Sequence, residues 1–490
     1  MIPRRTMTTS PPTVIVLSDL HLGAGPLDDF DAVIEEHFCT FLSELSSSDQ
    51  PTELVINGDF IDFVQAPPSE GHELEAETDR GIPLCFTEVQ SNEKLSAVLN
   101  EHKKAFVALQ EFVDSNPRNQ LTILPGNHDP DLFWPSIQDR VRDACLGTPT
   151  AAARVRFHLG QVYRPTSAPS AWIEHGHQHD ELNCFFVDGS PHWSVERPPI
   201  LLDVTGTPRL LECAGTRFLI RYLNGLDHRF HFVDNVKPFR SFVQALAMSP
   251  YNWYAGPIRL IAEVWRFRRY VYATALDHPS DLLAAGESYG WLDREAADAL
   301  RRRIGQLPPD AMDDFGAALI RAGINLRSSV TVFLAQDANA IVALNAIAEH
   351  PSEFDDSFGI GRAQYHPNSI QKRQPQLEDK PGTLGIGKRI VRSESETLIR
   401  AAREALQTPG VECVLMGHTH EWVTPSHEIA YANTGCWIRY LRLDEFTNFT
   451  WRDLEMPYWR YPFRLLFARI GLCPKAAMEM RVYAEGGGDQ

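Results

Sequence analysis

Five short apolar segments of this chain each lead into a group of Asp, His or Asn residues. The apolar run from Leu121 to Leu124 is followed within a few residues by Asn127, His128 and Asp129. The other four groups are Asp19-Leu-His21 after Thr13–Ser18, Gly58-Asp59 after Glu53–Asn57, His175-Gly-His177-Gln-His179-Asp180 after Ala171–Glu174, and Gly417-His418-Thr-His420 after Val411–Met416. Short apolar runs of this kind are typical of buried strands. Because ligands of open α/β sheets bind beyond the carboxyl ends of the strands, the five groups predict one shared site.

Helical patterns lie between these predicted strands, for example in Leu27–Leu45 and Lys94–Val113. Strands that alternate with helices favour a layered α/β fold. Gly, Asn and Asp are also common in turns and helix caps, so any single polar group is compatible with an ordinary turn. That interpretation does not explain why a polar group follows all five strands.

The composition disfavours several classes of protein. A chain of 490 residues, 43% of them hydrophobic, has room for two domains or for one domain with a large insertion, and is too apolar to be wholly disordered. Its net charge of −18 disfavours a protein that wraps the nucleic acid backbone, although a local basic patch is compatible with that charge.

The predicted location is cytoplasmic. The eight cysteines are scattered without any Cys-x-x-Cys pair, a distribution that fits reduced thiols better than a disulfide framework or a zinc ribbon. The first residues, MIPRRTMTTSPP, contain no apolar stretch of the kind found in signal peptides. The closest approach to a membrane span, Ser329–Ala348, is interrupted by Gln336, Asp337 and Asn339.

Asp, His and Asn at the strand ends suit a divalent metal such as Mn, Fe or Zn, and the lack of Cys among them disfavours a structural zinc site. Side chains two residues apart in an extended segment point the same way, so Asp19 and His21 can share an ion, as can His418 and His420. Asp59 can use both carboxylate oxygens to bridge two ions. A pair of ions roughly 3.5–4 Å apart can support phosphoryl transfer to water.

The ordered series Asp-x-His, Gly-Asp, Gly-Asn-His-Asp, His-Gly-His and Gly-His-x-His resembles the calcineurin-like metallophosphoesterase superfamily. The resemblance covers residues 13–180 and 408–452. It implies an α/β fold of four layers, a metallophosphoesterase-type β-sandwich flanked by helices, here with a large and mainly helical insertion. The strands predicted at Ile429–Thr434 and Trp437–Leu443 fit its closing sheet.

The resemblance also implies roles for individual residues. The first of two divalent ions, for which we expect Mn, with Fe and Zn as alternatives, would be held by Asp19, His21, Asp59 and His420. The second ion would be held by Asp59, Asn127, His175 and His418. His128 would contact the scissile phosphate or protonate the leaving group, with Asp129 tuning it.

Three nearby residues have less definite roles. The resemblance selects His175 as the ligand among the three histidines of its segment. His177 and His179 are either outer contacts of the metal or substrate, or ordinary loop residues, the latter especially for His179. Asp62 either orients a ligand or begins a helix.

The resemblance also narrows the reaction. Protein phosphatases of this superfamily have Asp-Arg-Gly after Gly-Asp and use Gly-Asn-His-Glu, which differ from the motifs here, Gly58-Asp-Phe-Ile-Asp-Phe63 and Gly126-Asn-His-Asp129. The chain is more similar to bacterial phosphoesterases, including the UDP-2,3-diacylglucosamine pyrophosphohydrolase type. We therefore expect hydrolysis of a phosphate ester or pyrophosphate in a small or lipid-linked substrate.

Two other classes remain open. A nuclease or cyclic-nucleotide phosphodiesterase would use the same metals and a basic groove, which the net acidity disfavours. A non-catalytic scaffold would have lost ligands, yet every expected ligand position is filled.

The predicted domains are a first core segment at 13–180, a helical insertion or cap at 181–407, a second core segment at 408–452 and a C-terminal extension at 453–490. Within the insertion, 209–272 is aromatic and locally basic, 280–350 has helical patterns, and 351–391 is rich in Gly, Pro and charge, as in a flexible linker or lid. The arginines of 209–272 are either solvated or recognise a second phosphate or an anionic head group. Peripheral membrane contact is a related alternative, through this segment or through Tyr458–Phe467.

Overall fold

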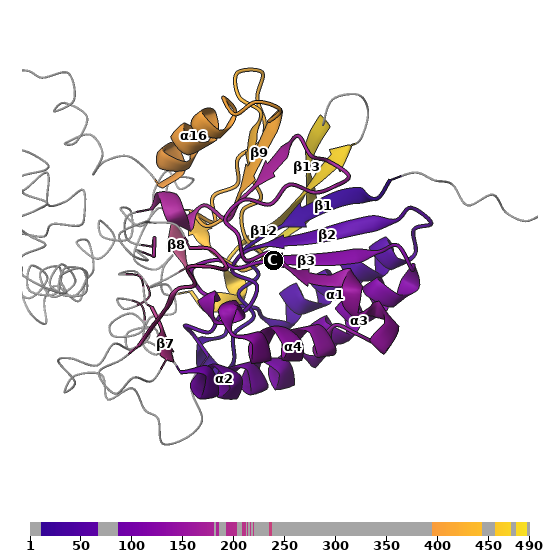
Figure 1. Ribbon diagram of the computed structural model, residues 1–490, viewed down its shortest axis with the longest axis vertical. Helices are drawn as coiled ribbons and strands as arrows, with labels where there is room; N and C mark the ends of the chain where they lie inside the picture. The colour runs from indigo at the N-terminus through magenta and orange to yellow at the C-terminus, as the bar shows by residue number, and fades with distance from the viewer. Residues whose placement is uncertain are drawn as a thin grey trace, which may run out of the picture. The chain divides into compact units, whose positions relative to one another are not determined.

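The computed structural model describes residues 11–66, 87–180, 183–185, 193–202, 208–211, 213, 216, 219, 235–237, 394–442, 456–471 and 477–487. The helical pattern predicted at 280–350 and the linker predicted at 351–391 lie outside the described residues, as does most of 209–272. The described residues before position 244 and those from Glu394 onward belong to one compact unit (Figure 1).

The larger sheet of this unit has the strand order β13-β12-β1-β2-β3-β4. Its strands are β1 (Thr13–Leu17), β2 (Thr52–Asn57), β3 (Gln120–Leu124), β4 (Val155–Phe157), β12 (Phe463–Gly471) and β13 (Ala477–Gly486). The first four are parallel to one another, whereas β12 pairs antiparallel with β1 and β13 pairs antiparallel with β12. Residues 453–490, predicted as a C-terminal extension, therefore supply two strands of the central sheet.

A second sheet has the order β10-β9-β5, with all neighbours parallel. Its strands are β5 (Ala171–Ile173), β9 (Cys413–Met416) and β10 (Tyr431–Asn433). Two small pairs join β6 (Ile200–Leu202) to β7 (Pro208–Leu210) and β8 (Val236–Lys237) to β11 (Leu441–Arg442). The strand predicted at Trp437–Leu443 is thus reduced to β11, which pairs outside the second sheet.

Helices cover the outer faces of these sheets (Figure 1). The helices are α1 (Ala32–Ser46), α2 (Glu88–Glu101), α3 (Lys103–Ser115), α4 (Pro135–Ala144) and α16 (Glu394–Ala405), with short 3-10 turns η1 (Gly25–Leu27), η2 (Pro130–Phe133), η3 (Pro149–Arg154), η4 (His177–His179) and η9 (Tyr458–Arg460). The first predicted helix starts late, at Ala32, because Asp31 accepts hydrogen bonds from two backbone amides of its first turn.

The helix predicted across Lys94–Val113 is instead two helices. His102 separates them, with a non-helical backbone (φ −101°, ψ 37°). Its side chain turns inward, where Nε2 lies 3.1 Å from the carbonyl oxygen of Gly23 and 3.3 Å from Oδ2 of Asp28, and Nδ1 lies 3.6 Å from Oε1 of Glu35. A buried polar anchor at this position outweighs the helical periodicity of the sequence.

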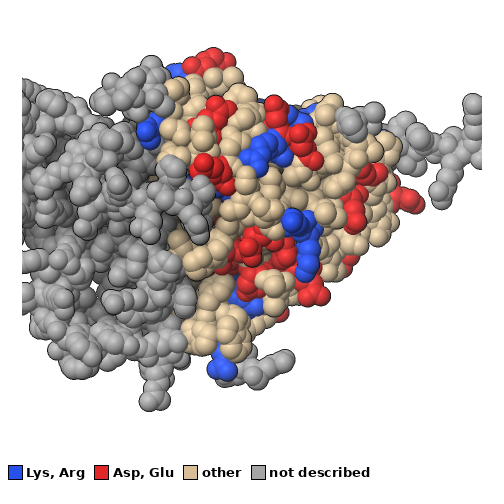
Figure 2. Space-filling model, turned by 90° about the horizontal axis from the view of Figure 1, so that it is seen from below, with Lys and Arg blue, Asp and Glu red and all other residues tan. Residues whose placement is uncertain are grey.

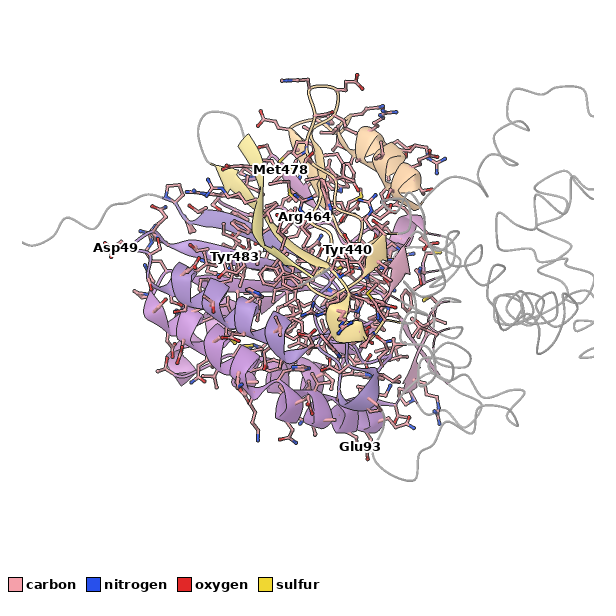
Figure 3. The ribbon with its side chains drawn as sticks, turned by 180° about the vertical axis from the view of Figure 1, so that it is seen from behind. Asp49, Glu93, Tyr440, Arg464, Met478 and Tyr483 are labelled. Atoms are coloured by element: carbon pink, nitrogen blue, oxygen red, sulfur yellow. The ribbon has the colours of Figure 1, made fainter. Side chains whose placement is uncertain are left out.

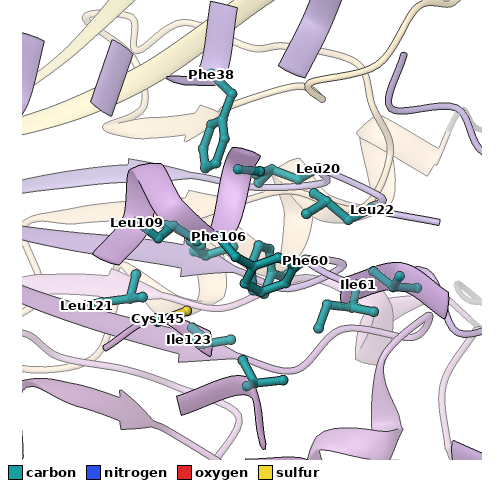
Figure 4. Packing of buried hydrophobic residues seen from close by; sticks show 14 of the residues in the cluster. Leu20, Leu22, Phe38, Phe60, Ile61, Phe106, Leu109, Leu121, Ile123 and Cys145 are labelled. Atoms are coloured by element: carbon teal, nitrogen blue, oxygen red, sulfur yellow. The ribbon is translucent and has the colours of Figure 1, made fainter. Parts of the chain in front are cut away.

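Alternate residues of each central strand face different cores. In β1, Ile15 and Leu17 pack against the helices, whereas Val14 and Val16 pack between the two sheets. Figure 4 shows the core under the helices, which includes Leu20 and Phe60 from the loops that follow β1 and β2. Leu398 and Ala402 of α16 cover the outer face of the second sheet. The predicted mixed α/β class, with a sheet rich in parallel pairs, is confirmed.

The β12–β13 hairpin is packed against the rest of the core (Figure 3). Tyr483 of β13 lies against Phe41 of α1 at 5.0 Å between ring centroids and stacks on Trp437. The apolar part of the segment considered for membrane contact, Tyr458–Phe467, is therefore mostly strand β12, with Leu465 and Leu466 buried in the sheet. Among the described residues, no helix combines the length and hydrophobicity needed to cross a bilayer.

The buried contacts of His102 predict a pH-dependent stability. Burial lowers the pKa of His102, but Asp28 and Glu35 outweigh that effect and raise its pKa above 6.5. The protonated form therefore stabilises the fold below the unfolded pKa, and this contribution is lost as pH rises through the folded pKa. In urea unfolding between about pH 6 and pH 9, the wild type should lose about 1 kcal/mol more stability than His102→Gln. Equal losses in the two proteins would contradict this role for His102.

Candidate metal centre

The carboxyl ends of the parallel strands meet at one edge of the structure. Strands β1, β2 and β3 are in parallel register, so the loops after Leu17, Asn57 and Leu124 emerge side by side. Backbone hydrogen bonds continue between the first two loops, from the Asp19 amide to the Gly58 carbonyl (3.2 Å) and from the His21 amide to the Asp59 carbonyl (2.9 Å). The loop after β9 joins the loop after β5 through the Gly417 amide, which donates to the His175 carbonyl. The predicted groups therefore converge.

Five non-glycine residues among the described part of the chain have a left-handed backbone, and all five are predicted metal ligands. They are Asp19, His21, Asp59, His418 and His420, with φ between 49° and 71°. This conformation is uncommon outside glycine and costs roughly 1–3 kcal/mol per residue. Unfavourable backbone geometry confined to the candidate ligands indicates that the fold holds these side chains in one direction for a purpose other than stability.

Three glycines next to the candidate ligands leave room for them. A Cβ atom on Gly58 would collide with the ring of His175, one on Gly126 with the carboxylate of Asp59, and one on Gly417 with the carboxylate of Asp19. Gly58, Gly126 and Gly417 are therefore needed where one strand end approaches the candidate ligand of another.

The first group of candidate ligands consists of Asp19, His21 and His420. One donor atom from each lies within 4.8 Å of the others, and all three residues are buried. Nε2 of His21 is 3.0 Å from Nε2 of His420, and the latter atom is 3.6 Å from Oδ1 of Asp19. Two imidazole nitrogens this close need a shared cation or a proton between their lone pairs.

The second group consists of Asp59, His175 and His418, again with donor atoms within 4.8 Å of one another. Nε2 of His175 lies 3.2 Å from Oδ2 of Asp59 and 3.3 Å from Oδ1 of Asn127, which adds a fourth donor, an amide oxygen. The same Asp59 oxygen is 3.8 Å from Nε2 of His21 in the first group. Asp59 therefore contacts both groups.

His128 lies beside both groups but belongs to neither. Its Nδ1 is 2.8 Å from Oδ2 of Asp62, and its backbone amide donates to Oδ1 of Asp59 at 2.9 Å. Its side chain is 13% exposed, whereas those of Asp62 and Asp59 are 1–2% exposed, so the histidine is the more accessible residue. Nε2 is left as the nitrogen that can meet a ligand.

Asp62, rather than Asp129, contacts the ring of His128. Oδ2 of Asp62 also lies 2.9 Å from Nδ1 of His21, so this carboxylate orients two imidazoles. Asp129, predicted to tune His128, instead accepts hydrogen bonds from the backbone amides of Gly126 (2.5 Å) and Phe60 (2.9 Å). It ties the loop after β3 to the loop after β2, and Asp62 supplies the contact with His128.

The other two histidines of the fourth motif point away from the donor groups. His177 is buried against Trp193, at 4.5 Å between ring centroids, and burial together with the nearby His175 lowers its pKa well below 6.5. His179 is 2.9 Å from Oε1 of Glu174. His175 alone of the three lies in a candidate ligand group, as the resemblance implied.

The carboxylates of this centre attract positive charge. Burial raises the pKa of Asp59, but His175 and His128 outweigh it and lower the pKa well below 3.8. Burial lowers the pKa of His128, and the carboxylates of Asp62 and Asp59 reverse this and raise it to about 9. A concentration of buried carboxylates and imidazoles that stabilise each other's charges is suited to bind cations.

The donor set fits divalent metal ions. It contains carboxylate, amide and imidazole donors without thiolate, and among the described residues Nδ1 of the buried His418 has no hydrogen-bond partner. A metal-binding imidazole usually donates a hydrogen bond from its second nitrogen to an acceptor outside the metal site. Nδ1 of His21 faces such an acceptor in Asp62, and Nδ1 of His175 faces one in the Asn57 carbonyl. The Asn57 carbonyl is far from His175 in sequence, so local sequence patterns do not reveal it as the acceptor.

Comparison with known proteins agrees with this geometry. The family model described as calcineurin-like phosphoesterase matches residues 12–185. Residues 12–185 thus match a family of metal-dependent phosphoesterases, and this match supports the resemblance to the calcineurin-like metallophosphoesterase superfamily. His418 and His420 lie beyond the matched segment in sequence, but in the structure they lie beside the candidate ligands of that segment. Neither curated proteins nor solved structures give a match.

The crowding around Gly58 predicts a substitution effect. Gly58→Ala should be more destabilising than Gly410→Ala, because both glycines have φ near 80° but only the former would collide with a neighbour. The left-handed conformation alone costs an alanine about 1–2 kcal/mol, and displacement of His175 should add about 1–3 kcal/mol. Urea unfolding of the two metal-free variants measures the difference. Similar losses would show that Gly58 is needed only for its backbone angle.

Proposed function

We propose that this protein is a dinuclear metallohydrolase that cleaves a phosphate ester or pyrophosphate bond. The calcineurin-like phosphoesterase domain itself implies metal-dependent hydrolysis of phosphoesters. The number of ions and the identity of the metal, for which we propose two ions of Mn, go beyond the family match.

The contact of Asp59 with both ligand groups is the observation that supports a dinuclear centre. Oδ2 of its carboxylate lies near His175 of the second group and His21 of the first, while Oδ1 accepts the His128 amide. We assign Asp19, His21 and His420 to the first ion, Asn127, His175 and His418 to the second, and Asp59 to both. When bound, two such ions neutralise phosphate charge and activate water.

The protein's own residues would hold the substrate and move a proton. His128, fixed through Nδ1 by Asp62, presents Nε2 to a phosphate oxygen or to the leaving-group oxygen. With Nδ1 held by Asp62, Nε2 can stabilise negative charge on the phosphate or donate a proton to the leaving group. Asp129 supports this geometry through the backbone rather than through the histidine ring.

The wider architecture supports further proposals. We propose that the helices, the two sheets and α16 correspond to the four-layer metallophosphoesterase sandwich, and that residues 181–407 include a cap over the centre. The substrate would be a phosphorylated small molecule or a lipid-linked one. Figure 2 presents acidic and basic side chains interspersed on one face of the described residues, a distribution that does not favour nucleic acid. Cytoplasmic location stays a prediction from the cysteines.

Metal dependence is the first test. Chelation should abolish hydrolysis of phosphomonoesters, phosphodiesters, nucleotides and nucleoside-diphosphate lipids alike, and Mn should restore it best because the donors are oxygen and imidazole. Asp59→Asn should lose bound metal at both positions, measured by elemental analysis. Activity in fully metal-free protein would refute the proposal, and Asp59→Asn with both metals and normal turnover would refute the bridge.

Substitutions of the neighbouring residues Asn127 and His128 should have different effects on metal binding and turnover. Asn127→Ala should weaken binding of the second ion, and excess Mn should partly restore turnover. His128→Ala should keep both ions and lose about 10²–10⁴-fold in kcat, with no rescue by Mn. The loss should be smaller for aryl phosphates, whose leaving groups need little protonation. A missing ion in His128→Ala would overturn this division of roles.

A further inference from the structure

The carboxylate of Asp180 lies against the outer side of the second ligand group. Its Oδ2 is 3.1 Å from Nε2 of His418, with side-chain exposures of 16% and 6% respectively. Asp180 does not belong to either group of candidate ligands. It follows the histidine motif in sequence, but nothing local relates it to His418, which lies 238 positions later.

This contact determines which nitrogen of His418 carries the proton. A carboxylate accepts hydrogen bonds, so the neutral imidazole places its proton on Nε2 and its lone pair on Nδ1. Of the two ring nitrogens of His418, Nδ1 is the one without a hydrogen-bond partner among the described residues. His175 has the opposite arrangement, because the Asn57 carbonyl lies 2.9 Å from its Nδ1 and leaves Nε2 to face Asp59.

Asp180 is itself fixed by the turn that begins the predicted insertion. Its amide donates to the His177 carbonyl at 3.0 Å, and Nδ2 of Asn183 donates to the same Oδ2 that faces His418, at 2.6 Å. A little further on, Oγ1 of Thr216 lies 3.5 Å from the Asn127 carbonyl. The start of the insertion thus contacts two loops that carry candidate ligands of the second ion.

We propose that Asp180 is a positioning residue for the second metal ion, which fixes the His418 ring so that Nδ1 faces the ion. This inference rests on the proposed dinuclear centre and assigns a role in metal binding to the residue that immediately precedes the predicted insertion. Asp62 acts on the other group, through Nδ1 of His21. Loss of Asp180 should therefore weaken binding of the second ion and leave binding of the first ion unchanged.

Metal affinity measures this role directly. Loss of the acceptor that holds the second nitrogen of a metal-bound histidine typically lowers the metal affinity by about 10–100-fold. Titration of metal-free protein with Mn, followed by calorimetry and by electron paramagnetic resonance, separates the two ions, because a pair of nearby Mn ions gives a spin-coupled signal and a single ion does not. In Asp180→Ala, the second dissociation constant should rise about 10–100-fold while the first stays unchanged.

Two further variants make the test specific. Asp180→Asn keeps the volume and one oxygen acceptor but removes the charge, so its effect should be smaller than that of alanine; it also serves if alanine does not fold. Asp139→Asn removes a carboxylate that is 71% exposed and paired with Arg142, and should leave both ions unchanged. Metal-free Asp180→Ala should melt at the wild-type temperature, with a smaller rise on addition of Mn.

The outcomes separate this inference from the proposed function. A wild-type protein without the spin-coupled pair would refute the dinuclear centre. A wild-type pair together with an unchanged second affinity in Asp180→Ala would overturn the role of Asp180 and leave the proposed function intact. Equal weakening of both ions, or a lower melting temperature of metal-free Asp180→Ala without any change in metal affinity, would reduce Asp180 to a structural residue.

Discussion

The carboxylate of Asp59 connects loops that follow strands of both sheets. Its two oxygens reach the amide of His128, Nε2 of His175 and, more distantly, Nε2 of His21. These contacts require that four loops from two different sheets lead toward the same point. The parallel register of β1 with β2 and of β5 with β9 provides this, since parallel strands end at a common edge.

The convergence has a cost, which the cores offset. Five left-handed residues, spread over three loops, together cost several kcal/mol, at roughly 1–3 kcal/mol each. The residues between them hold the loops in place: Leu20 and Phe60 are fully buried under the helices, and each such side chain contributes about 1.5–3 kcal/mol. Hydrogen bonds between adjacent loops, such as that from Leu22 to the Phe60 carbonyl, add to this.

Outer acceptors then complete the centre. The Asn57 carbonyl, Asp62 and Asp180 each hold the far nitrogen of one imidazole, at 2.9–3.1 Å. They come from a strand end, from the loop that follows a ligand, and from the start of the insertion. A histidine whose ring is fixed in this way needs no rearrangement to bind an ion, so under the proposed function these acceptors would strengthen metal binding without touching the metal.

The sequence by itself predicted the mixed α/β class, the strands that precede the candidate ligands and the polar residues that lie together at their ends, because apolar runs with polar ends are a local signal. Only the tertiary structure decided three matters. Strands β12 and β13 extend the central sheet, since strand pairing is set by partners distant in the chain. A helical pattern breaks at His102, since its buried acceptors come from another segment. Asp62 rather than Asp129 holds His128, and Asp180 reaches His418, because a hydrogen bond depends on where folded loops place two atoms and sequence neighbours do not reveal that.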